Sequence, residues 1–139
     1  MREARAGDAA EIARLALELG YPASTEAMRA RLQSLLPSPR HRIVVAQGER
    51  LLGWIAVERR CTLESGEFVE IVGLVVDAAA RGQGVGRALV ADAEAWAMGQ
   101  GFDAIRVRSN VARDASHPFY ESLGFARTKT QHAYHKALK

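Results

Sequence analysis

The spacing of apolar residues along the chain predicts alternating helices and strands. In the first quarter of the sequence, apolar residues recur every three or four positions, as in amphipathic helices. One helix is predicted to begin at the capping residue Asp8, with a capping box to Glu11, and to end at Gly20. A second is predicted to begin at Ser24 or Thr25 and to end before the prolines that follow.

The middle of the chain changes to a strand pattern. Short apolar or alternating runs follow one another, separated by polar turns. They predict strands over residues 42–46, 51–59 and 68–76, the first two joined by a turn at Gly48. A short additional strand is predicted at residues 2–5.

The rest of the chain alternates between helix and strand periods. The pattern predicts a helix over 85–98, a strand over 104–108, a short helix over 114–122 and a last pair of strands within 125–137. This order predicts an α/β (α+β) fold in one domain, residues 1–139, with a mixed central sheet of six to seven strands and helices on both faces.

Three glycines at alternate positions, Gly82, Gly84 and Gly86, stand where a buried strand gives way to a helix. Such a turn lets several backbone N–H groups point into one concavity, and the helix N-terminus adds unpaired donors. Arg81 and Arg87 flank the turn with positive charge. The turn favours a phosphate ligand, although glycines at such a junction also serve tight turning alone.

Two familiar phosphate-binding motifs do not fit this turn. The dinucleotide fingerprint G-x-G-x-x-G, started at Gly82, requires a third glycine where Arg87 stands. No Gly-Lys-Ser or Gly-Lys-Thr triplet follows, so the nucleoside-triphosphate loop is also excluded.

The turn resembles a signature of one known family. Residues 81–86 match the R/Q-x-x-G-x-G/A motif of the GCN5-related N-acetyltransferases, the GNAT superfamily. Residues 70–77 resemble the family's central strand. Asn110 and residues 117–125 resemble its downstream asparagine and its F-Y-x-x-x-G-F segment. The three motifs stand in the family's order and cover most of residues 67–125.

The resemblance implies an enzyme that uses acetyl-CoA and acetylates a primary amine by direct attack in a ternary complex. It also implies two neighbouring parallel strands that splay apart, the one beginning near Phe68 and the one ending near Ser109, with the pantetheine arm between them. The residues that it assigns to the coenzyme are Leu74, Val75, Val76, Arg81, Gly82, Gln83, Gly84, Val85, Gly86, Arg87, Asn110, Phe119 and Tyr120.

The resemblance implies that Tyr120 is the acid that protonates the departing thiolate. Phe119 and Leu123 form the apolar stripe of the predicted short helix, and Tyr120 is rotated about 100° away from that stripe. A core aromatic or a purely structural hydroxyl is the alternative. Asn110 would reach the pantetheine or a water, or else it caps a turn or helix.

Glu70 is the candidate base, because it stands eleven positions before Arg81 as the family's catalytic glutamate stands before its own loop. If no bulge intervenes, Glu70 shares a strand face with Val72, Leu74 and Val76. Apolar neighbours would raise its pKa and suit it to base work. A water acting as the base, or a Glu70 that faces solvent, is the alternative.

Composition narrows the partners. The net charge of +3 comes from scattered residues without a Lys/Arg run, which disfavours a nucleic-acid partner. Cys61 is the single cysteine, so no intramolecular disulfide forms and a reducing cytoplasm fits. No apolar run approaches the ~20 residues of a membrane span, and no His/Cys/Asp spacing resembles a metal site.

The acceptor is expected to be a small-molecule amine or a peptide amine. The segments that build the acceptor side in this family supply a mildly acidic rim of Glu18, Tyr21, Glu26, Glu64, Glu67 and Tyr134. A homodimer is an expectation from the family alone. The alternative function is a non-catalytic acyl-CoA-binding sensor.

Overall fold

The computed structural model describes residues 1–108 and 116–139. The chain forms two compact units, Met1–Arg108 and Ser109–Lys139. The elements of the first unit are β1 (Arg2–Glu3), the 3-10 turn η1 (Ala6–Asp8), α1 (Ala9–Glu18), α2 (Thr25–Leu35), β2 (His41–Gln47), β3 (Leu51–Thr62), β4 (Gly66–Val76), the 3-10 turn η2 (Ala78–Ala80), α3 (Val85–Gly99) and β5 (Arg106–Val107).

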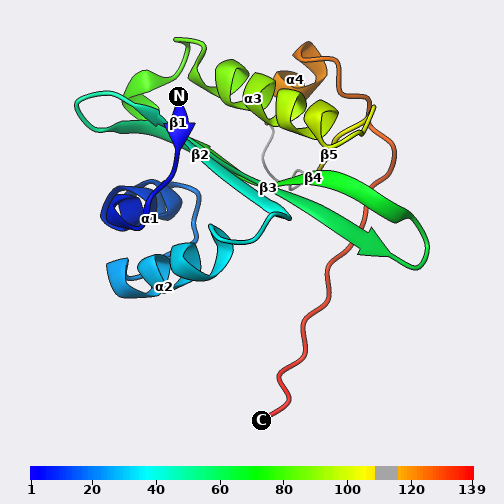
Figure 1. The fold of residues 1–139 in the computed structure, drawn as a ribbon, viewed down its shortest axis with the longest axis horizontal. Helices are drawn as coiled ribbons and strands as arrows, with labels where there is room; N and C mark the ends of the chain where they lie inside the picture. The colour runs from blue at the N-terminus through cyan, green and yellow to red at the C-terminus, as the bar shows by residue number, and fades with distance from the viewer. Residues whose placement is uncertain (109–115) are drawn as a thin grey trace. The chain divides into compact units, whose positions relative to one another are not determined.

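The strands form one mixed sheet in the order β1-β2-β3-β4-β5 (Figure 1). Each of the first three pairings is antiparallel, and β4 pairs with β5 in parallel. Helices α1 and α2 lie on one face of this sheet and α3 lies on the other. The predicted mixed sheet with helices on both faces and a parallel pair is therefore confirmed.

The predicted number of six to seven strands is wrong, because the described residues form five. The second unit contains α4 (Ser116–Ser122), and residues 123–139 form neither helix nor strand. Its last apolar side chains are not buried: Tyr134 is 93% and Leu138 is 84% exposed. Since residues 126–139 bury no side chain, they lack the apolar face that would pin a strand.

The core beneath α1 and α2 forms from the stripes that the sequence predicted. Ile12 and Leu15 of α1 and Leu32 of α2 pack with Ile43 and Val45 of β2. Each of these five side chains is buried. Burial of this apolar area is the main force that holds both helices on the sheet.

The start of α2 matches its prediction more closely than the start of α1. Ser24 is the N-cap of α2, and its Oγ accepts a hydrogen bond from the Ala27 N–H at 3.0 Å. The predicted capping box of Asp8 and Glu11 is wrong. The Asp8 carboxylate instead accepts hydrogen bonds from the guanidinium of Arg2, which ties β1 to this turn.

On the opposite face, a glycine lets α3 come close to the sheet. A Cβ atom at Gly53 of β3 would lie 2.7 Å from the Val75 carbonyl oxygen and 3.2 Å from Leu89 Cδ1. Val85, the first residue of α3, is also in contact range of that position. The absence of a side chain at Gly53 thus allows the first turn of α3 to pack closely against the end of β4.

Strand β4 contains a β-bulge. Ala56 and Val57 of β3 pair with Gly73 and Ile71, so Val72 is an extra residue between two rungs of the ladder. Val72 is 51% exposed although β4 lies between β3 and β5 in the sheet. An isolated glycine inside a strand, such as Gly73, is a sequence signal of a bulge.

The bulge reverses the alternation of side chains along β4. Glu70 consequently lies on the same face as Val75, which packs in the core beneath α1 and α2. The predicted face for Glu70, shared with Val72, Leu74 and Val76, is wrong, because an odd residue inserted in a strand moves all later residues to the other face.

Among the residues that the structure describes, no helix is long and apolar enough to cross a membrane.

Candidate active site

The glycine turn connects η2 to α3, and two of its glycines have a positive φ. Gly82 has φ +81° and Gly84, the N-cap of α3, has φ +80°. Both values fall in the left-handed region, which L-residues with a side chain avoid. Nothing lies within 4 Å of where a Cβ atom of either glycine would stand. The space over both glycines is therefore open to a ligand.

The backbone donors of this turn have no acceptors on the protein. Between Gly82 and Arg87, no N–H group donates to the backbone or a side chain of another described residue. The first intrahelical bond of α3 comes only at Ala88, whose N–H donates to the Gly84 carbonyl at 3.0 Å. These donors and the positive end of the α3 dipole suit an anion.

Positive side chains at the turn are also uncommitted. Arg81 and Arg87 are exposed, and neither forms an ion pair with a residue of the two described ranges. Their guanidinium groups can bind phosphate oxygens in a bidentate manner. The predicted coenzyme residues from Arg81 to Arg87 thus lie together at one exposed turn.

An ion pair fixes the start of this turn to α1. Asp77 caps η2 by accepting from the Ala79 N–H at 2.9 Å, and its other oxygen accepts from Arg14 of α1 at 3.0 Å. These two contacts, in that order of size, lower the pKa of Asp77. Arg14 is itself fixed by Glu11 and by the Leu51 carbonyl. Sequence reasoning missed both Arg14 and Asp77, since ion pairs between distant elements have no local pattern.

At the end of β4, the backbone N–H and C=O groups of two residues point away from β3. The Asp77 N–H donates to the Leu52 carbonyl at 2.8 Å, so Asp77 faces β3. Backbone groups alternate in direction along an antiparallel strand. Val75 therefore also faces β3, whereas the N–H and C=O groups of Leu74 and Val76 point to the other edge.

That other edge of β4 is only briefly paired. Its parallel ladder with β5 has two rungs, Glu70 with Arg106 and Ile71 with Val107. Beyond Ile71, β4 continues to Val76 without a partner on this side among the described residues. Unpaired backbone groups on a strand edge can pair with an extended ligand. The expected separation of the two strands near Ser109 lies outside the described residues.

Glu70 lies in a different environment from the turn. Its side chain is buried, and the whole residue is 4% exposed. Oε1 accepts from Arg108 Nε at 2.8 Å, and Oε2 accepts from Arg60 Nη1 at 2.7 Å and from Arg108 Nη2 at 3.2 Å. Both carboxylate oxygens are thus occupied by guanidinium donors.

The charge partners decide the pKa of Glu70. Burial acts to raise it, but the hydrogen bonds and positive charges of Arg108 and Arg60 outweigh burial and hold the pKa below its usual value. The predicted rise in the pKa is wrong, because the expected apolar neighbours are replaced by two arginines. Arg108 could have been found from the alternation of residues 104–108, and no sequence signal pointed to Arg60.

Tyr120 lies in α4, within the C-terminal unit. Its ring is half-buried and packs edge-on against Phe119 at 5.2 Å and Phe125 at 5.7 Å between ring centroids. The backbone N–H groups of Leu123 and Phe125 donate to the Tyr120 carbonyl. The roles of Tyr120 and Phe119 at a coenzyme remain predictions, and Asn110 lies outside the described residues.

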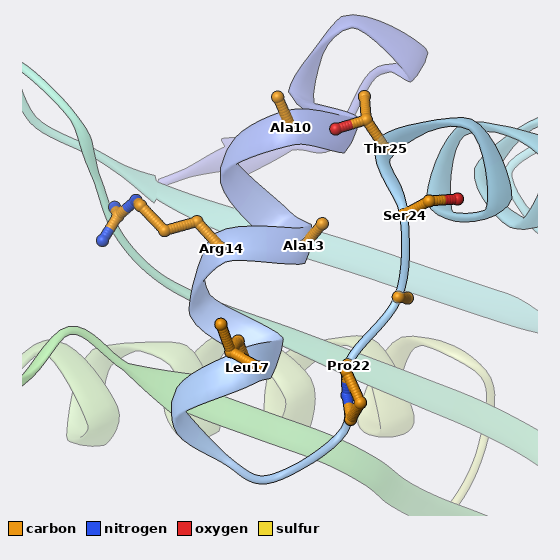
Figure 2. A pocket seen from close by; sticks show the side chains of 8 residues that line it. Ala10, Ala13, Arg14, Leu17, Pro22, Ser24 and Thr25 are labelled. Carbon is orange, nitrogen blue, oxygen red and sulfur yellow. The ribbon is translucent and has the colours of Figure 1, made fainter.

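A shallow groove of about 520 Å³ runs between α1 and the link to α2 (Figure 2). Ala10, Ala13, Arg14 and Leu17 of α1 form one wall. The other wall consists of residues 22–25. Arg14 is the charged lining residue, and its guanidinium is already bound to Glu11 and Asp77. The groove therefore offers apolar contacts and hydroxyl groups rather than a carboxylate for a cation.

The predicted acidic rim is partly neutralised. Glu67 lies 3.0 Å from Arg40 and 3.5 Å from Arg59, so its charge is shared with two cations. Glu18, Glu26 and Glu64 are exposed. Within the described ranges no group of His, Cys, Asp and Glu side chains could hold a metal ion.

A model of the acetyltransferase (GNAT) family matches residues 9–125, which include the glycine turn, the β4 edge and α4. The chain belongs to the GNAT family of acetyltransferases. A search of curated proteins returned no match.

Solved structures share the fold of this GNAT chain. The aminoglycoside 6'-N-acetyltransferase AAC(6')-IG from Acinetobacter haemolyticus has a TM-score of 0.84 at 20% identity and covers 99% of this chain and 98% of its own. A putative acetyltransferase from Agrobacterium tumefaciens gives 0.83 at 26% identity, with 97% and 98% covered. AAC(6')-Iy in complex with the bisubstrate analogue CoA-S-monomethyl-acetylneamine gives 0.85 at 19% identity, with 98% and 96% covered.

Proposed function

We propose that the protein is an acetyl-CoA-dependent N-acetyltransferase that acetylates a primary amine in a ternary complex. The observation that carries the proposal is the row of backbone donors from Gly82 to Arg87, which have no acceptors on the described protein. The space over Gly82 and Gly84 in this row is open. These donors follow the unpaired edge of β4 in the chain, after the short turn η2. A diphosphate and an amide-bearing arm, joined as they are in coenzyme A, match this sequence of sites.

The turn would hold the diphosphate and β4 would hold the arm. N–H groups of the turn donate to phosphate oxygens, and Arg81 and Arg87 add charge-assisted contacts. The N–H and C=O groups of Leu74 and Val76 pair with the two amides of the arm, as a further strand would. An N–H group there would also stabilise the negative charge that develops on the thioester oxygen.

The reaction needs a neutral amine and a protonated leaving group. An ordinary lysine-type amine has a pKa of ~10.4, so about one molecule in 2,500 is neutral at pH 7. The amine nitrogen attacks the thioester carbonyl carbon, the carbon–sulfur bond breaks, and the Tyr120 hydroxyl gives its proton to the sulfur. The base that accepts the amine proton is Glu70 or a water, and the three hydrogen bonds already on Glu70 favour a water.

The acceptor is an amine on a small molecule or a peptide. Aminoglycosides belong in the test panel because proteins of the same fold acetylate them. The groove beside α1 offers no carboxylate, so a singly charged or partly apolar amine suits it better than a polycation. From the family resemblance we also propose that the protein is cytoplasmic and forms a homodimer. Sedimentation of the purified protein tests the homodimer.

One observation favours a second candidate, an acyl-CoA sensor without turnover. Both carboxylate oxygens of Glu70 accept hydrogen bonds from arginines, and the lowered pKa of Glu70 makes it a weak base. A domain that binds the coenzyme and lacks an efficient base would respond to acyl-CoA rather than consume it.

Two measurements separate these functions. Acetyl-CoA is expected to raise the melting temperature, and release of free thiol in the presence of an amine panel is expected to show turnover. Binding without turnover on any amine identifies the sensor. No binding at all removes both proposals.

The Tyr120→Phe variant tests the acid. It removes the transferable proton and keeps the ring contacts with Phe119 and Phe125. We expect kcat to fall by ~10²-fold or more while the dissociation constant of acetyl-CoA is unchanged. Phe125→Leu, which alters the packing of the same ring, serves as the matched packing control. Unchanged kcat in Tyr120→Phe excludes Tyr120 as the acid.

A further inference from the structure

Three strands meet in an ion-pair cluster around Glu70. Arg60 comes from β3, Glu70 from β4, and Arg108 directly follows β5. Arg108 binds the carboxylate through two nitrogens, Nε and Nη2, so that the two planar groups engage side by side. Arg60 adds one contact from the other side of β4. The carboxylate thus joins both neighbours of β4 to it.

The position of this cluster along β4 matters more than its charge. Glu70 and Ile71 are the two residues of β4 that pair with β5, and the bulge residue Val72 follows at once. The Arg108 contact therefore lies where the parallel ladder ends and the unpaired edge begins. A two-rung ladder is a weak attachment by itself, because each of its hydrogen bonds replaces one with water and adds little net stability.

A second contact on the same face fixes the direction of β5. Arg106 lies over the ring of Phe68, with its guanidinium carbon 4.1 Å from the ring centroid, and Arg60 lies over the same ring at 5.7 Å. Phe68 and Glu70 are two residues apart on β4, and Arg106 and Arg108 are two residues apart after α3. Two side-chain pairs in this spacing hold β5 in one register.

We propose that the Glu70–Arg108 pair is a clamp that holds β5 at the end of its ladder with β4, and that Arg108 is a positioning residue for the coenzyme. This inference rests on the proposed function, because the edge of β4 beyond the clamp is where the pantetheine arm would pair. Glu70 acts through Arg108 and the backbone in this role. The clamp keeps β5 in the one arrangement in which the β4 edge is accessible.

Loss of the clamp lowers the fraction of molecules in that arrangement. The apparent dissociation constant rises by the inverse of the competent fraction. If Arg108→Ala leaves about one molecule in ten competent, the dissociation constant of acetyl-CoA rises about tenfold. The KM for acetyl-CoA follows it, whereas kcat at saturating coenzyme changes little. Arg108→Lys keeps the charge without the paired contact and is expected to recover part of the affinity.

Two control variants separate the clamp from other effects of lost ion pairs. Arg42 binds Asp92 of α3 through Nε and Nη2 at 2.9 and 3.2 Å, which is the same two-nitrogen geometry at a site away from β5. Arg42→Ala should lower the melting temperature without changing the dissociation constant. Arg60→Ala removes a charge from Glu70 but leaves β5 attached, so it should weaken binding less than Arg108→Ala does.

Calorimetry with acetyl-CoA, together with initial rates over a pH range, decides the outcome. A higher dissociation constant in Arg108→Ala and Glu70→Gln, with the wild-type shape of the kcat–pH profile, supports the clamp. Equal affinities in wild type and Arg108→Ala overturn it, as does loss of an ionisation from the profile of Glu70→Gln, which assigns the base to Glu70. If the wild-type protein itself does not bind acetyl-CoA, the proposed function fails instead.

Discussion

The open end of β4, which leads into the glycine turn, and the middle of the strand around Glu70 are opposite in character. At the open end, backbone donors from Gly82 to Arg87 have no acceptors among the described residues, and Arg81 and Arg87 form no ion pair with any of those residues. At the clamp, both oxygens of Glu70 are occupied by arginine donors, and the residue is buried. Unsatisfied polar groups at a surface can bind a ligand, whereas satisfied buried groups hold a structure. One strand thus has an open end that is suited to binding a ligand and a middle that is held by ion pairs.

The largest expected effect comes from placing a negative charge at the open end. Gly84→Asp adds a carboxylate at φ +80°, a conformation that strains any side chain but that aspartate adopts more readily than most residues. The carboxylate repels a diphosphate and competes for the same N–H groups. We expect acetyl-CoA affinity to fall about a hundredfold, or ~2.7 kcal/mol, by calorimetry.

The matched control for this variant is Gly101→Asp. Gly101 has φ +92° and, like Gly84, nothing within 4 Å of its Cβ position, but it follows the other end of α3. Equal losses of affinity in the two variants would show that backbone strain, rather than occupation of the turn, explains the result.

The ion pairs of Glu70 predict that a substitution there changes the stability of the protein and the dependence of that stability on pH. The pKa of Glu70 is lowered in the folded protein, so the unfolded chain binds more protons in the acid range. The stabilisation is complete above the pKa of the unfolded chain and is lost as the pH falls through the folded pKa. Glu70→Gln should cost roughly 1–2 kcal/mol at pH 7, since Arg60 and Arg108 retain access to water.

Urea denaturation of both proteins between pH 3 and 7 measures this difference. The gap between wild type and Glu70→Gln should narrow below about pH 4.5, the ordinary pKa of a glutamate. Asp8, Glu11 and Asp77 also have lowered pKa values, but they are common to both proteins and cancel in the difference. A gap that widens toward acid pH contradicts the ion-pair explanation.

The smallest expected effect belongs to a single exposed charge at the open end. Arg87→Ala removes one phosphate contact and leaves the backbone donors in place. We expect a loss of affinity of about threefold at low salt, and less at high salt because exposed charges are screened. Arg31→Ala, an exposed arginine on α2, is the control for net charge. A loss that is independent of salt would contradict a purely electrostatic contact.

Most of the fold, and the open end of β4, could be predicted from local sequence. The glycine turn needed only residue types at fixed spacing, and in the structure its N–H groups find no acceptors among the described residues. The ion-pair cluster around Glu70 could not be predicted in this way. Its partners Arg60 and Arg108 come from two other strands, and the bulge at Val72 moved Glu70 to the unexpected face.

The prediction of a last pair of strands was wrong for a related reason. Residues 125–137 have some β-forming side chains, but strand formation depends on a neighbour and a face to bury. In the described C-terminal unit, the side chains of residues 126–139 are exposed and pair with no strand. Propensity alone could not supply that information.

The central claim is that main-chain donors of the glycine turn bind the coenzyme's diphosphate. An amide-resolved NMR titration with acetyl-CoA tests it most directly. The account predicts saturable shifts for the N–H signals of Gly82, Gly84 and Gly86, with Leu74 and Val76 shifting in step, and little change at Gly101. Saturable binding that leaves the three glycine signals of the turn in place would contradict the claim.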